Sequence, residues 1–126
     1  MKPIISAAAG LTLIMLVCGV PTAQTQQEMT AREGQAFREA DKAMNAAYDR
    51  LMGKLSPTGQ VALREVQRSW LRFRDQECDF ETLGSTDGSV HPIVVYNCKA
   101  RLTRVRTADL LAQVRCPEGD VGCGNQ

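Results

Sequence analysis

The sequence has little of what enzymes and nucleic-acid-binding proteins depend on. Its 126 residues include one histidine, one tryptophan, two tyrosines and three phenylalanines, and the formal net charge is +1. A protein that binds nucleic acid needs a clear basic surplus, which is absent here. No nucleotide-binding loop, Ser-His-Asp set or metal-ligand motif is visible in the sequence. The composition therefore predicts a non-enzymatic protein with no cofactor, no metal and no nucleic-acid partner.

A single long apolar run stands at the start of the chain. Lys2 precedes "IISAAAGLTLIMLVCGV", which is followed by a proline and small residues. A positive charge, an apolar core and a small-residue end are typical of a secretory signal peptide. The run is short for a membrane span, which needs about 20 apolar residues. We therefore expect residues 1–23 to be a signal peptide and residues 24–126 to be one small helical domain, periplasmic or secreted by a bacterium.

Cys18 leaves a second way of processing open. A bacterial lipoprotein is cut just before a cysteine that then carries the lipid, and the residue before it is small. Here that residue is Val17, so a lipoprotein is the less favoured alternative. Contact with a membrane is expected only if Cys18 is lipidated.

Four cysteines remain after the apolar run: Cys78, Cys98, Cys116 and Cys123. An even number in an exported chain predicts two disulfides, and four cysteines allow three pairings. The turn-rich segment "LGSTDGSV" has its centre near residue 88, and Cys78 and Cys98 each lie ten residues from it. In an antiparallel helical hairpin such residues are level, so we expect Cys78–Cys98. Cys116–Cys123 would then close a short C-terminal loop.

Apolar residues recur at spacings of three and four in three segments, which predicts three helices. These cover residues 34–55, residues 57–82, and a stretch that begins after residue 89 and runs to about residue 114. Ser56 and Ser89 are the expected N-caps. The hydrophobic body of the second helix is expected to consist of Trp70, Phe73 and Phe80. The expected fold is an all-α, three-helix antiparallel bundle stapled by disulfides.

Polar residues interrupt the apolar face of the second helix beside the only tryptophan. Arg74 and Glu77 are one turn apart, so we expect them to pair, because a buried arginine without a partner keeps its desolvation cost. Arg106 lies level with Trp70 across the turn and can add a cation–π contact. We interpret Trp70, Arg74, Glu77 and Arg106 as a structural network that fixes the register of the helices.

The segments "ADKAMNAAYDRLM", "QRSWLRFRDQEC" and "GSVHPIVVYNCKARLTRVRTADL" resemble the LprI-like lysozyme-inhibitor family of small exported bacterial proteins. The resemblance spans residues 25 to about 112. It implies a helical, disulfide-bonded, exported protein whose partner is another protein, with lysozyme the expected one. Arg32 stands where family members often have a cysteine, which implies that the N-terminal arm is not stapled in the family's manner.

Three functions are compatible with these residues. An inhibitor of a muramidase, the glycosidase class to which lysozyme belongs, needs a protrusion that fits a cleft, and two loops qualify. The loop of residues 84–91 offers Ser85, Ser89 and His91 as hydrogen-bond donors, and the tail loop 116–123 offers Glu118 and Asp120 to a basic surface. The alternative is a non-catalytic adaptor that binds another envelope protein through the third helix, which has two apolar sides. A hydrolase that uses Glu77 and Glu81 is the least favoured.

Overall fold

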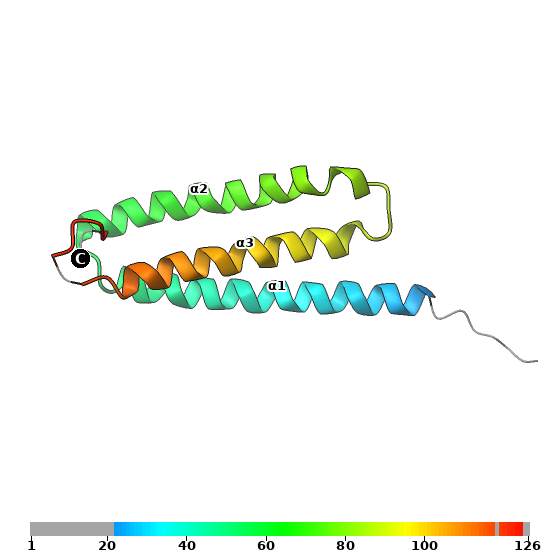
Figure 1. Cartoon of the computed structure of the whole chain (residues 1–126), viewed down its shortest axis with the longest axis horizontal. Helices are drawn as coiled ribbons and strands as arrows, with labels where there is room; N and C mark the ends of the chain where they lie inside the picture. Colours follow the sequence, from blue (N-terminus) through cyan, green and yellow to red (C-terminus); the bar gives the residue numbers. More distant parts are fainter. Residues whose placement is uncertain (1–21, 118, 125–126) are drawn as a thin grey trace, which may run out of the picture.

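The computed structural model describes residues 22–117 and 119–124. Within them lie α1 (Thr22–Met52), α2 (Pro57–Glu81), a short 3-10 turn η1 (Leu83–Ser85) and α3 (His91–Val114). The helices run antiparallel in sequence order, and α3 lies between α1 and α2 (Figure 1). The described residues contain no strand. The predicted all-α, three-helix architecture is therefore confirmed.

The bounds of the first helix differ from those predicted. It begins at Thr22 rather than at residue 34, and it ends at Met52 rather than at residue 55. The early part carries few apolar side chains, so the periodicity did not reveal it. Gly53 follows the last helical residue, as its poor helix propensity favours. Residues 1–21, which make up most of the expected signal peptide, lie outside the described part.

The two expected N-caps have different outcomes. Ser56 caps α2 as predicted, since its hydroxyl accepts a hydrogen bond from the Gly59 N–H, and Pro57 occupies the first turn. Ser89 does not cap α3, because the N-cap position belongs to Val90, which makes no side-chain cap bond. The Ser89 hydroxyl instead accepts a hydrogen bond of 2.8 Å from the Gln26 amide of α1.

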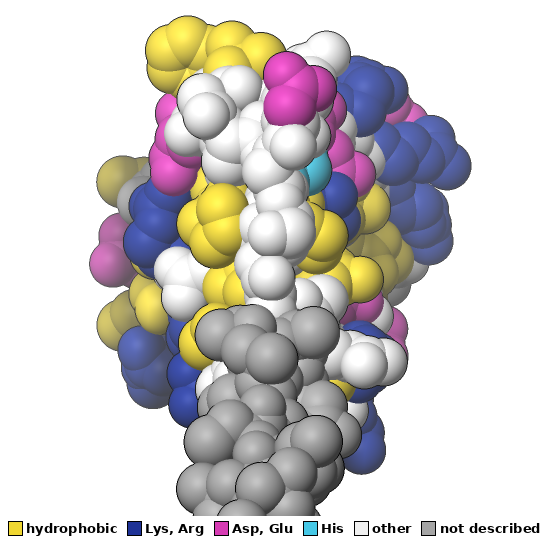
Figure 2. All heavy atoms as spheres, turned by 90° about the vertical axis from the view of Figure 1, so that its right-hand side faces the viewer, with side chains coloured by type: hydrophobic (Ala, Val, Ile, Leu, Met, Phe, Trp, Pro, Cys, Tyr) yellow, Lys and Arg dark blue, Asp and Glu magenta, His cyan; other side chains and the backbone are white. Residues whose placement is uncertain are grey.

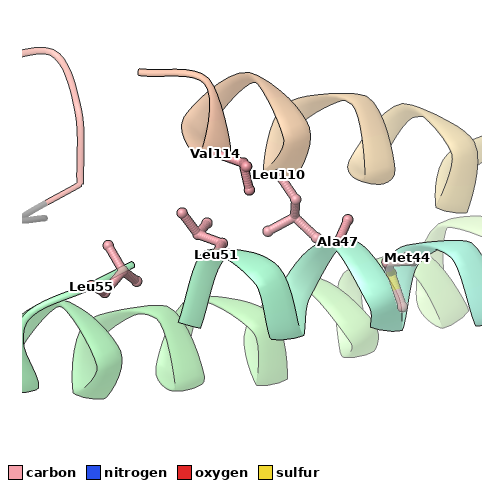
Figure 3. Packing of buried hydrophobic residues seen from close by; sticks show 6 residues of the cluster. All are labelled: Met44, Ala47, Leu51, Leu55, Leu110 and Val114. Atoms are coloured by element: carbon pink, nitrogen blue, oxygen red, sulfur yellow. The ribbon is translucent and has the colours of Figure 1, made fainter. Parts of the chain in front are cut away.

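The α1–α3 pair is packed closely because small residues line it. Ala40 and Ala47 of α1 and Ala100 of α3 are all buried. A Cβ atom placed on Gly34 would lie 3.3 Å from the ring of Tyr96, so α3 approaches α1 there at a distance that suits glycine. The hydrophobic core lies toward the other end of the pair (Figure 3). It consists of Met44, Ala47, Leu51, Leu55, Leu110 and Val114.

The second helix does not bury the aromatic face that the sequence predicted. Its buried positions include Gln67, Arg74 and Cys78. Phe73 is 50% exposed and Phe80 is 69% exposed. Trp70 is partly buried and packs against the core, as predicted. The prediction was wrong for Phe73 and Phe80, because helical periodicity shows which residues share a face but not which face meets the neighbouring helices. Here the disulfide and the buried arginine set the rotation of α2.

Candidate functional site

The loop between α2 and α3 is a compact turn held by its own backbone. The N–H of Ser85 donates to the Thr82 carbonyl, that of Gly88 to the Ser85 carbonyl and that of His91 to the Gly88 carbonyl. A Cβ on Gly88 would lie 3.2 Å from the Ser85 carbonyl oxygen, so this close approach favours glycine. The loop therefore has a defined shape at the end of the helical hairpin.

Two of the predicted binding residues, Ser85 and His91, contact each other. The Ser85 hydroxyl donates to the Thr82 carbonyl over 2.8 Å and lies 3.0 Å from His91 Nδ1. A hydroxyl has one hydrogen, so Nδ1 carries the hydrogen that joins the histidine to Ser85. This leaves Nε2 of His91 for a partner, as acceptor in the neutral ring and as donor in the protonated ring. Ser85 supports the loop, while His91 is the group that can reach outward.

The end of the molecule that carries this loop also exposes apolar side chains. Leu83 is 65% exposed and Val90 is 44% exposed. Figure 2 views this end, where hydrophobic side chains lie beside the polar atoms of the turn and Lys and Arg gather along the flanks. Sequence reasoning concentrated on the hydroxyls of the loop and missed both residues. An apolar centre with a polar rim is the usual composition of a protein-binding patch.

The disulfide predicted from the turn geometry supports this loop. Cys78 and Cys98 are bonded, with Cα atoms 5.7 Å apart, and both residues are buried. Arg101 of α3 adds two hydrogen bonds to the carboxylate of Glu81, one turn of α2 closer to the loop. Both stems of the loop are thus tied together just behind it.

The second candidate loop lies at the opposite end of the bundle (Figure 1). The predicted Cys116–Cys123 disulfide closes it, with Cα atoms 5.9 Å apart. The Asp120 carboxylate accepts a hydrogen bond from Gly122 N–H, and Gly119 has a φ of 82°, a conformation that favours glycine. Glu118 lies outside the described residues. The 25 residues of α2 separate the two loops by about 37 Å, so they cannot enter one cleft together.

A cavity of about 600 Å³ opens beside the tail loop, between the first half of α2 and the last half of α3. Apolar side chains dominate its walls, among them Leu55, Leu63 and Leu110. Arg106 and Asp109 stand at its side. It lies far from the loop of residues 84–91.

Arg74 lies at the centre of the predicted polar network, but its carboxylate partners are not the expected one. Its side chain is 9% exposed and bonds Asp41 of α1 over 3.2 Å and Asp75 over 3.0 Å. Its guanidinium also lies over the rings of Phe37 and Trp70. The expected pair with Glu77 was wrong, because Arg74 points toward α1, which supplies a carboxylate 33 residues away in sequence.

Arg106 and Trp70 meet as the register predicted. The Arg106 guanidinium lies 5.9 Å from the centre of the indole ring, and its Nε–H donates to Gln67 Oε1. Partial burial lowers the pKa of Arg106, and the nearby carboxylate of Asp109 opposes that shift. Gln67, Phe37 and Asp41 are members of this cluster that sequence reasoning missed. No local pattern identifies them, since Phe37 and Asp41 reach the cluster from α1 and Gln67 meets Arg106 of α3.

The cluster around Arg74 lowers the pKa of the Asp75 carboxylate. Partial burial would raise its pKa, but the hydrogen bond and charge of Arg74, together with the charge of Lys99, outweigh the burial. The pKa of Asp75 consequently lies below its ordinary value. Lys99 bonds the same oxygen over 3.3 Å, so Asp75 links α2 to α3.

The two glutamates considered for a hydrolase differ in their contacts. Glu81 is bound by Arg101, and within the described residues Glu77 forms no ion pair. Residues 22–117 and 119–124 also hold no group of three or more His, Cys, Asp or Glu side chains that could bind a metal ion. No described helix is long and apolar enough to cross a membrane.

Comparison with known proteins assigns the family. Residues 19–110 match the family described as "Lysozyme inhibitor LprI". The chain is also 30% identical over 128 residues to an uncharacterized protein of Rhizobium meliloti (strain 1021), an alignment that covers 82% of this chain and 92% of that protein. No solved structure matches. The family match spans α1, α2, the loop between α2 and α3 and most of α3, and so this chain belongs to the LprI lysozyme-inhibitor family.

Proposed function

We propose that this protein binds a muramidase and blocks it with the loop of residues 84–91. The observation that carries the proposal is the loop itself, a thin turn whose shape is fixed by backbone hydrogen bonds and by the Ser85–His91 contact. A fixed loop loses little conformational entropy on binding, which favours affinity. The family match includes this loop and ends at residue 110, before the tail loop.

The shape of the enzyme supports the choice of a loop. A glycosidase cleft is concave and works with two carboxyl groups. A helix with its side chains is about 10–12 Å across, which is too thick for most of such a cleft. The hydroxyl of Ser89 can donate a hydrogen bond to a carboxylate, and Nε2 of His91 can do so when the imidazole is protonated. Asp87 is exposed and has to face away from those carboxylates.

The exposed apolar residues at this end add to the proposed contact. Val90 adjoins Ser89 and His91 in the chain and can pack on the rim of the cleft while they reach into it. Leu83 stands at the other stem of the loop. Buried apolar anchors surrounded by polar groups supply most of the binding energy in protein interfaces.

The adaptor alternative requires a free apolar face on α3. This helix packs between α1 and α2 (Figure 1), and the core residues Leu110 and Val114 belong to it. Of its large hydrophobic side chains, Val105 is the one that is more than half exposed within the described residues. The muramidase proposal is therefore the better supported of the two.

A muramidase assay with a double variant tests the loop. Replacing Ser89 and His91 with alanine should weaken inhibition by about two to four orders of magnitude, because the variant removes two hydrogen bonds to charged groups and each contributes about 1.5–3 kcal/mol. The matched control is Asp120→Ala at the opposite end, which should inhibit like the wild type. Circular dichroism checks that both variants keep their helices.

Two results of this assay would contradict the proposal in different ways. Full inhibition by the folded double variant would remove the loop from the contact and leave the tail loop as the inhibiting element. If the wild type itself fails to inhibit several classes of lysozyme at micromolar concentration, inhibition is not the function of this chain.

We also propose that the protein acts outside the cytoplasm, as a periplasmic or secreted protein. Two disulfides in a small domain are typical of oxidising compartments. The exported form should begin near Gln24 and carry no lipid, because Val17 stands where a lipoprotein signal needs a small residue. The intact mass of the exported protein measures this. A form that begins at a diacylated Cys18 would show that the protein is a lipoprotein.

A further inference from the structure

One side of α2 carries an apolar stripe that is about half exposed or more, and its first residue, Val66, also lines the cavity between α2 and α3. Val66 is 51% exposed, Phe73 is 50% exposed and Phe80 is 69% exposed. These residues follow one another at intervals of seven, so they line up along one side of the helix. The residues between them on that side, Ala62, Ser69 and Gln76, are small or uncharged.

The seam of a two-helix coiled coil repeats every seven residues and has two core positions in each repeat. In α2 one of these positions is apolar, and Ala62, Ser69 and Gln76 occupy the other. Phe73 and Phe80 are not on the inward face of α2 in this bundle, because the buried positions in that part of the helix are Gln67, Arg74 and Cys78. Exposing two phenylalanines on a small soluble domain marks an interaction surface. The partner that fits must itself present a matching apolar seam.

The charges beside the seam indicate what that partner is. Arg72 and Glu77 stand on opposite edges of the seam, and within the described residues neither forms an ion pair. The Arg72 guanidinium donates a hydrogen bond of 3.3 Å to the Ser69 hydroxyl. In a parallel two-helix seam, edge residues five positions apart oppose each other across the interface. Arg72 of one copy would then face Glu77 of a second copy, and the reverse contact would form by symmetry.

We propose that the α2 stripe is the interface with a second copy of this chain, packed in parallel about a two-fold axis. In this register Val66, Phe73 and Phe80 each meet their own counterpart. An antiparallel seam centred near Phe73 would oppose Arg72 to Arg72 and Glu65 to Asp79, which are like charges. Shifting one helix of the antiparallel pair by seven residues removes that repulsion, but it places Phe73 opposite Gln76. This antiparallel pairing therefore buries fewer apolar side chains than the parallel one.

In the parallel dimer, both copies of the loop of residues 84–91 lie at the same end. The interface does not depend on the proposed inhibition of a muramidase, since it uses the side of α2 and does not include Ser89 or His91. The two proposals can therefore fail separately.

Light scattering coupled to gel filtration, with sedimentation equilibrium up to millimolar concentration, tests the dimer. The wild-type chain should have twice the mass of one chain. Phe73→Asp should give the single-chain mass at all concentrations, because a carboxylate would be buried against its counterpart. Val61→Asp is the matched control, since Val61 is 58% exposed on α2 but lies off the stripe, and this variant should remain a dimer.

Two further variants test the orientation. Ser69→Cys should form a disulfide between two copies on mild oxidation, since residue 69 meets its counterpart only in the parallel register, whereas Arg64→Cys on another face should not. Arg72→Glu should weaken the dimer about tenfold through repulsion from Glu77, and Arg72→Glu with Glu77→Arg should restore it.

Several outcomes would overturn the proposal. A wild-type chain that stays monomeric to millimolar concentration excludes the interface. A dimer that survives Phe73→Asp lies on another surface, and a failure of Ser69→Cys to cross-link excludes the parallel register. If the wild type is monomeric and Phe73→Asp abolishes muramidase inhibition, the stripe contacts the enzyme instead of a second copy.

Discussion

A variant in which Cys78 and Cys98 are both alanine should lose about 3 kcal/mol of unfolding free energy. The disulfide closes a loop of 20 residues. In the chain-entropy model a disulfide that closes a loop of this length lowers the conformational entropy of the unfolded chain, which stabilises the fold by about 3 kcal/mol. The sulfur atoms also lie in the interior, since Cys78 is 0% exposed and Cys98 is 5% exposed, so alanine leaves unfilled space as well. Urea unfolding followed by circular dichroism measures the loss.

The tail disulfide provides the matched control for this prediction. Cys116 and Cys123 are separated by seven residues, and both are less buried. The same model gives about 2 kcal/mol for the Cys116→Ala, Cys123→Ala variant. A larger loss from the tail pair than from the Cys78–Cys98 pair would show that the tail, and not the α2–α3 hairpin, holds the fold together.

Replacing Arg74 with alanine should lower the unfolding free energy by about 2–3 kcal/mol. The change removes two cation–π contacts and two ion pairs from a side chain that is 9% exposed. The loss stays below that of a fully buried pair, since Asp41 and Asp75 are 39% and 47% exposed and can turn to water. Arg74→Met is the control, because it keeps the packing against both rings, and it should lose about half as much.

The pH dependence of these variants gives a second measurement. The folded-state pKa of Asp75 lies below its value in the unfolded chain. Its stabilising contribution is therefore present above the unfolded pKa, which is about 3.9, and is lost as the pH falls through the folded pKa. Arg74→Ala should make the decline of stability below about pH 4 shallower than in the wild type. An unchanged acid profile, with an unfolding free energy within about 0.5 kcal/mol of the wild type, would show that Arg74 is not part of the folded core.

Much of the candidate site was accessible from the sequence because its geometry is local. Counting from the turn near residue 88 placed Cys78 level with Cys98 and Trp70 level with Arg106, and both contacts are present. Such counting works because two helices joined by a short turn rise by the same distance per residue. Such counting does not predict contacts within the turn, such as the one between Ser85 and His91. It also does not predict contacts from another helix, such as the hydrogen bond from Gln26 of α1 to Ser89.

The sequence by itself determined the helical class, the two disulfides, the start of α2 and the pairing of α2 with α3. These features can be predicted from the sequence because they depend on residues that are close together in the chain. The signals are helical periodicity, cysteine spacing and turn residues. Only the tertiary structure decided how α2 is rotated and which carboxylate Arg74 meets. Asp41 could become its partner only once α1 packed near α2, and in that packing Val66, Phe73 and Phe80 stay half exposed or more. The orientation of a helix depends on the summed contacts of its whole inward face, and a pattern within one helix does not contain them.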